Sequence, residues 1–219
     1  MSPAVNPRKR RYDAPRRAAA AALTRTAILA AAKDGFERRG WSGTTVPSIA
    51  EAAGVSPKTV EALFGTKAAL LTVVVDYAIR GDADDVPIVR KEQALAIEQE
   101  PRPAAMLDLH AGMVAAINER SAQIAWVVES AAPGDERVAP VWERMMSNLG
   151  DGARWAAETL LAKRGVRADL TLSEAEETFL VAMEWGTYRT LARSQAAGRD
   201  AFEAWVRRYY GRMLLGGRR

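Results

Sequence analysis

The feature that most constrains the fold is a tight turn between two short amphipathic segments near the N-terminus. The first segment follows Thr45, a residue type that caps helices, and its apolar residues recur at offsets of 0, 3, 4 and 7 from Val46. Gly54 then breaks the helix, and Ser56-Pro57 restarts one with a cap residue and proline at the first helical position. Two short helices joined across so short a turn form a helix-turn-helix.

Helical patterns flank this motif on both sides. Before it, residues 18–39 carry an apolar stripe and are followed by Gly40, which stands where a helix C-cap is expected. After it, Thr66 is expected to cap a further helix that begins at Lys67. The motif therefore lies in a bundle of small helices.

The second helix of the motif, residues 57–64, is the candidate recognition helix, which in such motifs enters the major groove of DNA. Val60 and Phe64 are expected to face inward, which leaves Lys58, Thr59, Glu61 and Ala62 outside. Lys58 and Thr59 are suited to contact phosphates or base edges. Lys67 stands at a helix N-terminus, where its charge and the backbone N–H groups would hold a phosphate. The residues expected to contact DNA are Thr45, Ser56, Pro57, Lys58, Thr59, Glu61, Ala62 and Lys67.

The positive charge is concentrated at the N-terminal end. Residues 1–67 contain twelve Lys/Arg and five Asp/Glu, whereas residues 68–219 contain nineteen and twenty-two, giving net charges of +7 and −3. Residues 1–17 hold three prolines and six Lys/Arg, and we predict a disordered basic arm there. Arg10 and Arg11 are candidates for the minor groove or for nearby phosphates. A solvated basic tail is an alternative of equal weight.

Beyond residue 80 the chain continues to show helical patterns and no strand-like alternation. Ser173 and Glu176, three residues apart, are typical of a capping box. The sequence therefore predicts an all-α protein. Helices are expected over about 89–100, 104–119, 122–131, 136–164, 173–197 and 200–215.

A specific set of residue types at fixed spacing surrounds the motif. It comprises Ile28-Leu29, Ala31-Ala32, Phe36, Gly40-Trp41, Thr44-Thr45-Val46, Ile49-Ala50, Ala53-Gly54-Val55-Ser56, Thr59-Val60, Phe64, Lys67 and Leu70-Leu71. With this set, residues 25–71 resemble the DNA-binding domain of the tetracycline-repressor (TetR) family of bacterial transcription regulators. The resemblance implies a three-helix DNA-binding domain at residues 18–66 and a helical ligand-binding and dimerisation domain at residues 67–219. It also implies a homodimer that binds double-stranded operator DNA with two inverted half-sites.

Glu61 and Ala62 depart from the family pattern. In the family a tyrosine usually follows the Thr-hydrophobic pair, often with His or Tyr after it, and these residues contact the DNA backbone. A carboxylate facing phosphates would weaken binding. Glu61 would instead pair with Lys58, which we favour, or accept a hydrogen bond from a cytosine amino group. Impaired DNA binding is the third interpretation.

The last two predicted helices carry broad apolar stripes and are the candidate dimer interface. The alternative is that the stripes face the chain's own core, and each helix is expected to serve both purposes. The candidate interface residues are Phe179, Met183, Thr187, Thr190, Phe202, Trp205, Val206, Tyr209 and Met213.

Large apolar side chains of the C-terminal domain are candidates for a ligand cavity, although each by itself is more typical of a core. They are Met106, His110, Met113, Trp126, Trp142, Met145, Trp155 and Trp185. His110, the only histidine, would hydrogen-bond a ligand or find a partner in the core. Glu129 and Glu184 are further polar candidates.

The leading functional hypothesis is a repressor that an apolar small-molecule effector releases from DNA. A regulator without a small-molecule ligand, acting as an activator or through protein contacts, is the alternative. An enzyme is a remote third hypothesis, because the chain has no cysteine, no Gly-x-Ser-x-Gly motif, no phosphate loop and no clustered metal ligands. No cofactor and no metal are expected. No run approaches the ~20 apolar residues of a membrane span, so we expect a cytoplasmic protein.

Overall fold

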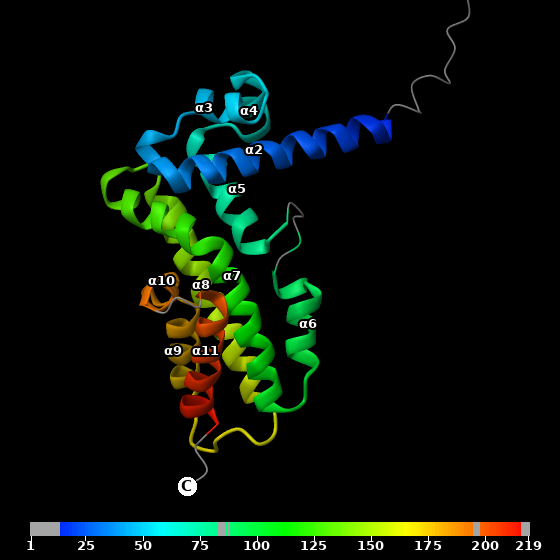
Figure 1. Ribbon diagram of the computed structural model, residues 1–219. Helices are drawn as coiled ribbons and strands as arrows, with labels where there is room; N and C mark the ends of the chain where they lie inside the picture. Colours follow the sequence, from blue (N-terminus) through cyan, green and yellow to red (C-terminus); the bar gives the residue numbers. More distant parts are fainter. Residues whose placement is uncertain (1–13, 83–85, 87, 195–197, 216–219) are drawn as a thin grey trace, which may run out of the picture. The chain divides into compact units, whose positions relative to one another are not determined.

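The computed structural model describes residues 14–82, 86, 88–194 and 198–215, and every regular element in these ranges is a helix (Figure 1). The all-α prediction is therefore confirmed. The chain divides into two compact units, residues 1–74 and 75–219. Within the described ranges no single helix is long and apolar enough to cross a membrane; one bent pair, Pro57–Phe64 with Lys67–Arg80, meets that test by length and composition alone.

The first unit contains α2 (Ala14–Gly43), α3 (Val46–Ala52), α4 (Pro57–Phe64) and the first part of α5 (Lys67–Arg80). Helix α2 begins at Ala14, before the expected residue 18, and Pro15 lies in its first turn, where a helix tolerates proline. At Gly40 the backbone leaves the helical conformation with φ 69° and ψ −177°, which glycine adopts without a steric cost. The buried apolar residues of this unit are Ile28, Leu29, Ala32, Phe36, Trp41, Ile49, Ala50, Val60, Phe64, Leu70, Leu71 and Val74.

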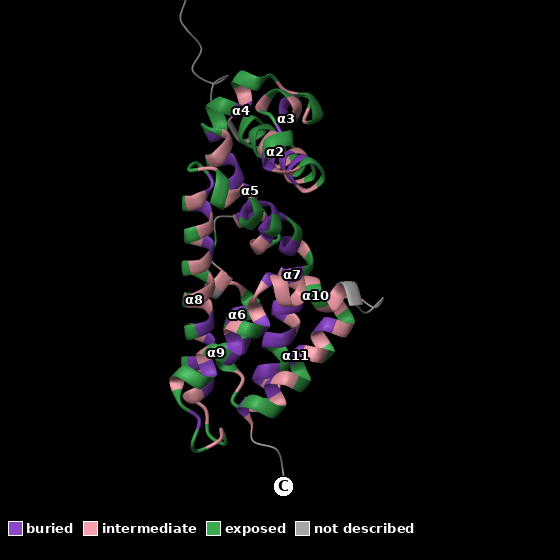
Figure 2. Ribbon diagram, turned by 90° about the vertical axis from the view of Figure 1, so that its left-hand side faces the viewer, coloured by how far each residue is buried: buried purple, intermediate pink, exposed green. Residues whose placement is uncertain are grey.

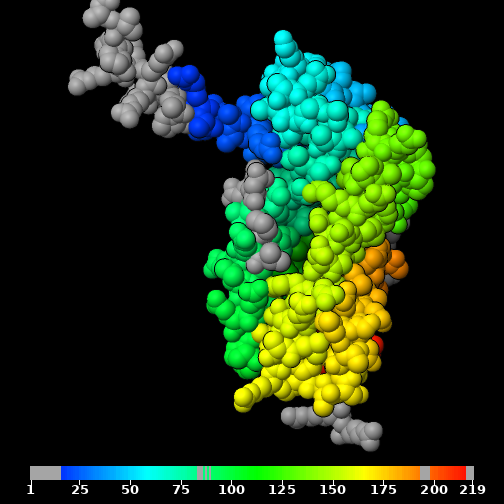
Figure 3. All heavy atoms as spheres, turned by 180° about the vertical axis from the view of Figure 1, so that it is seen from behind, coloured from blue at the N-terminus to red at the C-terminus, as the bar shows by residue number. Residues whose placement is uncertain are grey.

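The second unit is a bundle around one long central helix. Its elements after α5 are η1 (Ile88–Arg90), α6 (Glu92–Gln99), α7 (Pro103–Ala131), η2 (Ala132–Gly134), α8 (Ala139–Leu161), α9 (Leu172–Met183), α10 (Trp185–Ser194) and α11 (Gly198–Leu214). Helix α7 packs against α6, α8, α9, α10 and α11 and supplies many of the buried residues in this unit (Figure 2). Helices α8 and α9 lie side by side, and their atoms adjoin on the face shown in Figure 3.

Helix α7 is continuous, although we expected separate helices at 104–119 and 122–131. The two residues between those segments do not break the helix. Ser121 is buried and its hydroxyl donates to the Ile117 carbonyl one turn earlier. The Arg120 guanidinium reaches the carbonyls of Ala78 and Ile79 near the end of α5, at 3.3 and 3.0 Å. Arg120 and Ser121, which we had placed between two helices, therefore lie inside one helix, where their side chains bond to backbone carbonyls.

The helix expected over 173–197 is instead broken at Glu184, between α9 and α10. Glu184 has φ −65° and ψ 128°, and its carboxylate accepts the N–H of Thr187 at 2.7 Å, so it caps α10. Gly186 makes this possible, because a Cβ there would lie 2.8 Å from a carboxylate oxygen of Glu184. The acidic residue that we proposed as a polar ligand contact thus has a structural partner.

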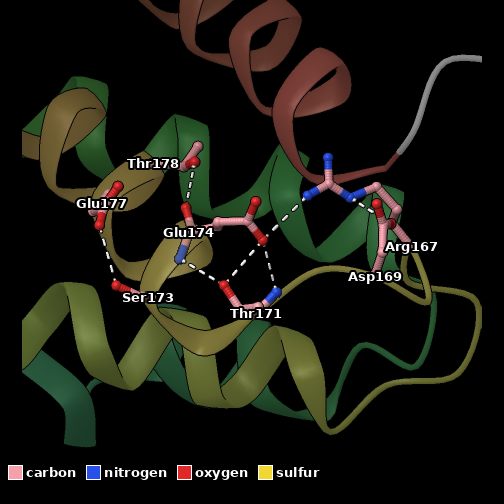
Figure 4. Close-up of polar contacts among 7 residues, drawn as sticks. All are labelled: Arg167, Asp169, Thr171, Ser173, Glu174, Glu177 and Thr178. Carbon is pink, nitrogen blue, oxygen red and sulfur yellow. Dashed lines mark hydrogen bonds and ion pairs between the residues drawn. The ribbon is translucent and has the colours of Figure 1, made fainter.

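A capping box does open α9, but two residues earlier than predicted (Figure 4). The hydroxyl of Thr171 accepts the N–H of Glu174 at 3.2 Å, and the Glu174 carboxylate accepts the N–H of Thr171 at 2.9 Å. That backbone hydrogen bond is the main cause that lowers the pKa of Glu174. Ser173 lies inside the helix and donates to Glu177. Arg167 also reaches the Glu174 carboxylate, at 3.4 Å.

Candidate functional site

The two short helices of the first unit are capped at the residues that the sequence predicted. Thr45 and Ser48 form a capping box at the start of α3, in which each side chain accepts the other's N–H at 3.2 Å. Ser56 caps α4 by accepting the N–H of Thr59 at 3.1 Å, and Pro57 occupies the first turn. The cap predictions are therefore confirmed. Both helix starts leave the caps exposed.

The turn between α3 and α4 has the geometry of a Schellman motif. The N–H of Val55 bonds to the carbonyl of Ala50 at 2.9 Å, and the N–H of Gly54 bonds to that of Glu51 at 3.1 Å. Gly54 has φ 67°, a left-handed conformation that an L side chain rarely adopts. The sharp reversal between the helices therefore depends on this glycine, and it separates α4 from α3 as a distinct helix.

The outer face of α4 is free to meet a partner. Val60 and Phe64 are buried, whereas Lys58, Glu61 and Ala62 are exposed, as predicted. Among the described residues neither Lys58 nor Glu61 forms an ion pair, so the Lys58–Glu61 pair that we favoured is absent. The carboxylate of Glu61 therefore remains exposed on the surface that carries Lys58.

Thr59 is half-buried, and its hydroxyl lies 2.8 Å from that of Ser56. This bond holds the first turn of α4 together. If either hydroxyl contacted DNA, it would have to do so in addition to the Ser56–Thr59 hydrogen bond or in place of it.

Lys67 has a structural role that its sequence position did not reveal. Its ammonium donates to the carbonyls of Trp41 and Thr44 at 2.8 and 2.9 Å, and it lies 3.8 Å from the centre of the Trp41 ring. The Thr44 hydroxyl in turn lies 2.8 and 2.9 Å from the carbonyls of Gly35 and Gly40. Lys67 thus fastens the loop after α2 to α5, and its role as a phosphate contact stays a prediction.

Arg10 and Arg11, the candidate contacts in the basic arm, lie outside the described residues. Arg16 and Arg17 lie in the first turn of α2 and are exposed. The proposed role of the arm stays a prediction.

The second unit contains a cavity of about 350 Å³. Five of the eight residues proposed for a ligand site line it: His110, Met113, Met145, Trp155 and Trp185. The other lining residues are Asp76, Ile79, Arg80, Ile88, Val114, Ile117, Asn118, Asn148, Leu149, Asp151, Gly152 and Met183. The volume falls within the range of small-molecule sites, and most of the wall is apolar.

Three proposed pocket residues lie elsewhere. Met106 belongs to the core between the helices and is fully buried. Trp126 is exposed, with the guanidinium of Arg189 3.8 Å from its ring centre. Trp142 is half-buried and does not line the cavity. Glu129, a further polar candidate, lies 3.7 Å from Arg189.

The sequence did not single out the polar residues of the cavity wall. Asp76 and Arg80 come from α5, and Asp76 accepts a hydrogen bond from Arg144 at 2.7 Å. Asn118 of α7 is buried among apolar neighbours. Its position eight residues after His110 on a mostly apolar helix was the available signal, because a buried amide there requires partners.

His110 and Tyr210 form a buried polar pair beside the cavity. The Tyr210 hydroxyl lies 3.0 Å from His110 Nδ1, and both side chains have no exposed surface. Burial lowers the pKa of His110 to about 3 and raises that of Tyr210 well above its usual range. Both groups are therefore neutral near pH 7.

The proposed dimer residues divide into buried and exposed sets. Phe179, Phe202 and Val206 lie in the chain's own core, the alternative that we had left open for the stripes. Trp205 and Tyr209 are half-buried and stack at 5.0 Å with an interplanar angle of 7°. The remaining candidates are half-buried (Met183, Thr187) or exposed (Thr190, Met213). Val181 is exposed as well and was not among the candidates.

A family model described as bacterial regulatory proteins, tetR family, matches residues 28–74. No curated protein matches the sequence. The fold is similar to that of a protein from a Rhodococcus species assigned to the TetR-family transcriptional regulators. The two are 16% identical over 87% of this chain and 98% of the other, with a TM-score of 0.67.

Two further solved structures share the fold. A TetR transcription regulator from Haloarcula marismortui is 16% identical over 88% of this chain and 98% of its own, with a TM-score of 0.61. A fatty acid metabolism regulator from Clostridium perfringens is 17% identical over 85% and 96%, with a TM-score of 0.61. These likenesses show the fold of both units. The family model covers the capped helix-turn-helix itself, so residues 28–74 match the DNA-binding domain of the tetR family of bacterial regulatory proteins.

Proposed function

We propose that the protein is a homodimeric repressor that a small, largely apolar effector releases from operator DNA. The exposed face of α4 is the observation that carries the DNA-binding part of this proposal, since its caps and buried residues leave Lys58 and Glu61 outward. The cavity of the second unit supports an effector, because it is lined mainly by apolar side chains. Operator DNA also makes the cytoplasm the expected place of action.

The homodimer is proposed on the apolar surface that α9 to α11 leave exposed. Val181 and Met213 are 45% and 44% exposed, and Trp205 and Tyr209 are half-buried nearby in the sequence. Two copies related by a twofold axis would present two recognition helices to two inverted half-sites. The α4 helix of each copy would enter the major groove.

Release from DNA requires that the effector bind one arrangement of the dimer more tightly than the other. An effector that favours the spacing of recognition helices unsuited to DNA would weaken operator binding. Coupling of about 1–3 kcal/mol is typical for such linkage and corresponds to roughly 5- to 150-fold in operator affinity.

Fluorescence anisotropy with DNA from upstream of the protein's own gene tests the DNA-binding part. Lys58→Ala should weaken binding, whereas Arg164→Ala, which removes an exposed positive charge from the second unit, should not. Equal losses from both substitutions would show that α4 does not form the interface. Sedimentation analysis of Met213→Glu tests the dimer, because a charge buried at the interface would shift the protein towards monomer.

A regulator without a small-molecule effector is the second candidate, and the exposed Glu61 is the observation that favours it. A carboxylate beside Lys58 reduces the attraction of this face for phosphates. A protein whose operator complex is unmoved by every cavity-sized compound, despite direct binding of such compounds, would belong to this class.

A further inference from the structure

The wall of the cavity contains two buried polar atoms that the described part of the protein leaves without a hydrogen-bond partner. They are Nε2 of His110 and Oδ1 of Asn118. The two side chains are 0% and 1% exposed. Buried polar atoms in native proteins nearly always have a partner, so two such atoms on one cavity wall indicate where a bound molecule would supply it.

The contact with Tyr210 determines whether His110 Nε2 donates or accepts a hydrogen bond. The ring is neutral, because burial lowers the pKa of His110 to about 3. Tyr210 needs an acceptor for its buried hydroxyl proton, and His110 Nδ1 lies 3.0 Å away. If the hydroxyl donates to Nδ1, the imidazole proton resides on Nε2. The opposite tautomer would leave the Tyr210 proton without an acceptor. Nε2 therefore carries the proton, and it is the donor that remains for a molecule bound in the cavity that His110 lines.

The contacts of the Asn118 amide nitrogen show that its other terminal atom, Oδ1, is a hydrogen-bond acceptor. Its Nδ2 donates to the carbonyls of Val114 and Met183, each at 3.3 Å. These two acceptors determine which end of the amide is the NH₂ group. Oδ1 is consequently an acceptor that needs a donor from a bound molecule.

The distance between the two residues, and the apolar wall that separates them, indicate the shape of that molecule. His110 and Asn118 are eight residues apart on α7, which corresponds to about 12 Å along the helix axis. The cavity wall between them is apolar, formed by Met113, Val114 and Ile117. A cavity of about 350 Å³ has the volume of roughly a dozen water molecules. The space suits a narrow hydrocarbon with a polar group at each end.

The charged residues of the wall do not favour an ionic ligand. Arg80 lies 3.9 Å from Asp76, and Asp76 accepts a hydrogen bond from Arg144 at 2.7 Å. The positive and negative charges at this end are therefore already paired. Asp151 is exposed and so is solvated. A buried carboxylate or ammonium on the ligand would lose its hydration without gaining a dedicated counter-charge.

We propose that the effector is an uncharged, elongated, mostly apolar molecule that accepts a hydrogen bond from His110 Nε2 and donates one to Asn118 Oδ1. Diols of medium chain length, with one hydroxyl at each end, have this chemistry. This assignment deepens the proposed effector role of the cavity and rests on it.

Direct binding to the full chain, without DNA, tests the assignment. Octane-1,8-diol, octanoate and octylammonium are titrated into the protein, and intrinsic tryptophan fluorescence is followed, since Trp155 and Trp185 line the cavity. The diol should bind at least about tenfold more tightly than either ion, because only the ions bury an unpaired charge. Equal or tighter binding of octanoate or octylammonium, or no binding of the diol up to its solubility, would overturn the assignment.

The contact itself is observable because His110 is the only histidine. In protein without a histidine tag, the imidazole gives a single set of ¹⁵N and ¹H ring signals. These should report the Nε2–H tautomer, and the diol should shift the Nε2–H proton. Binding of the diol without such a shift would contradict the proposal.

Two matched substitutions separate the polar contact from the cavity shape. Asn118→Leu removes the acceptor and should weaken diol binding about five- to tenfold, the usual effect of one hydrogen bond. Asn148→Leu changes an exposed amide on the same wall and should leave the affinity within about twofold. Equal losses would contradict the role of Asn118. None of these measurements includes DNA. If the diol binds but does not release operator DNA, the ligand assignment stands and the proposed effector role fails. If another compound releases operator DNA but the diol does not bind, the effector role stands and the ligand assignment fails.

Discussion

Replacing His110 by phenylalanine should remove much of the acid sensitivity of the fold. His110 is fully buried, and burial lowers its pKa to about 3, compared with about 6.5 in an unfolded chain. On acidification the unfolded chain therefore takes up a proton that the folded protein refuses. The stability contributed by the neutral imidazole is complete above pH 6.5 and is lost as the pH falls through that value towards 3.

The size of the effect follows from these two pKa values. Between pH 7 and pH 5 the unfolded imidazole becomes almost fully protonated while the folded one stays neutral. The resulting loss in the free energy of unfolding is about 2 kcal/mol. Carboxylates contribute little in this interval, because Glu100 and Glu174 have lowered pKa values when folded and about 4.3 when unfolded. The interval therefore isolates the histidine.

Urea unfolding of wild type and His110→Phe at pH 7, 6 and 5 measures this loss. The substitution also breaks the bond to Tyr210, but that cost is independent of pH in this range and leaves the slope interpretable. Tyr210→Phe is the matched control, because it breaks the same bond and keeps the imidazole, so it should retain the wild-type slope. If His110→Phe loses stability between pH 7 and 5 as steeply as wild type, the burial argument is wrong.

Three further substitutions test particular contacts. Lys67→Met should lower the free energy of unfolding by about 1–2 kcal/mol in thermal melts, because it removes two charged hydrogen bonds to the Trp41 and Thr44 carbonyls; an unchanged melt would refute this. Trp185→Phe should cost about 1 kcal/mol by removing the 2.9 Å bond to Ser121, again by melting. Glu61→Ala should tighten binding to non-specific DNA roughly two- to fivefold at low salt, and equal affinity would show that the carboxylate faces away from phosphates.

The helix-turn-helix could be predicted from sequence because its determinants are local. Thr45, Ser56 and Pro57 start helices by bonding to, or preparing, backbone groups within three residues. Gly54 reverses the chain through its own backbone conformation. The buried positions of α4 follow from a single helical period. None of these features requires knowledge of the rest of the chain, and each was confirmed.

The second unit was less predictable, because its boundaries depend on contacts between distant helices. The break after Met183 is held by Asn118 and by the bond from Trp185 to Ser121, residues more than sixty positions away. The Gly186 in the expected helix was the one local sign of a break. The sequence also could not tell which residues line the cavity. Met106 and Met113 belong to the same apolar pattern, but Met113 lines the cavity and Met106 lies in the core.

The sequence by itself determined the all-helical class, the DNA-binding motif and its outward residues, because periodicity and capping act over a few residues. The tertiary structure alone decided what Lys67 bonds to, which large side chains surround the cavity, and that Phe179, Phe202 and Val206 face the chain's own core. Within the described residues it also leaves one polar atom of His110 and one of Asn118 without a hydrogen-bond partner, and both residues line the cavity. Burial and pairing are properties of neighbours brought together by folding, and a pattern along one helix cannot specify which neighbour is missing.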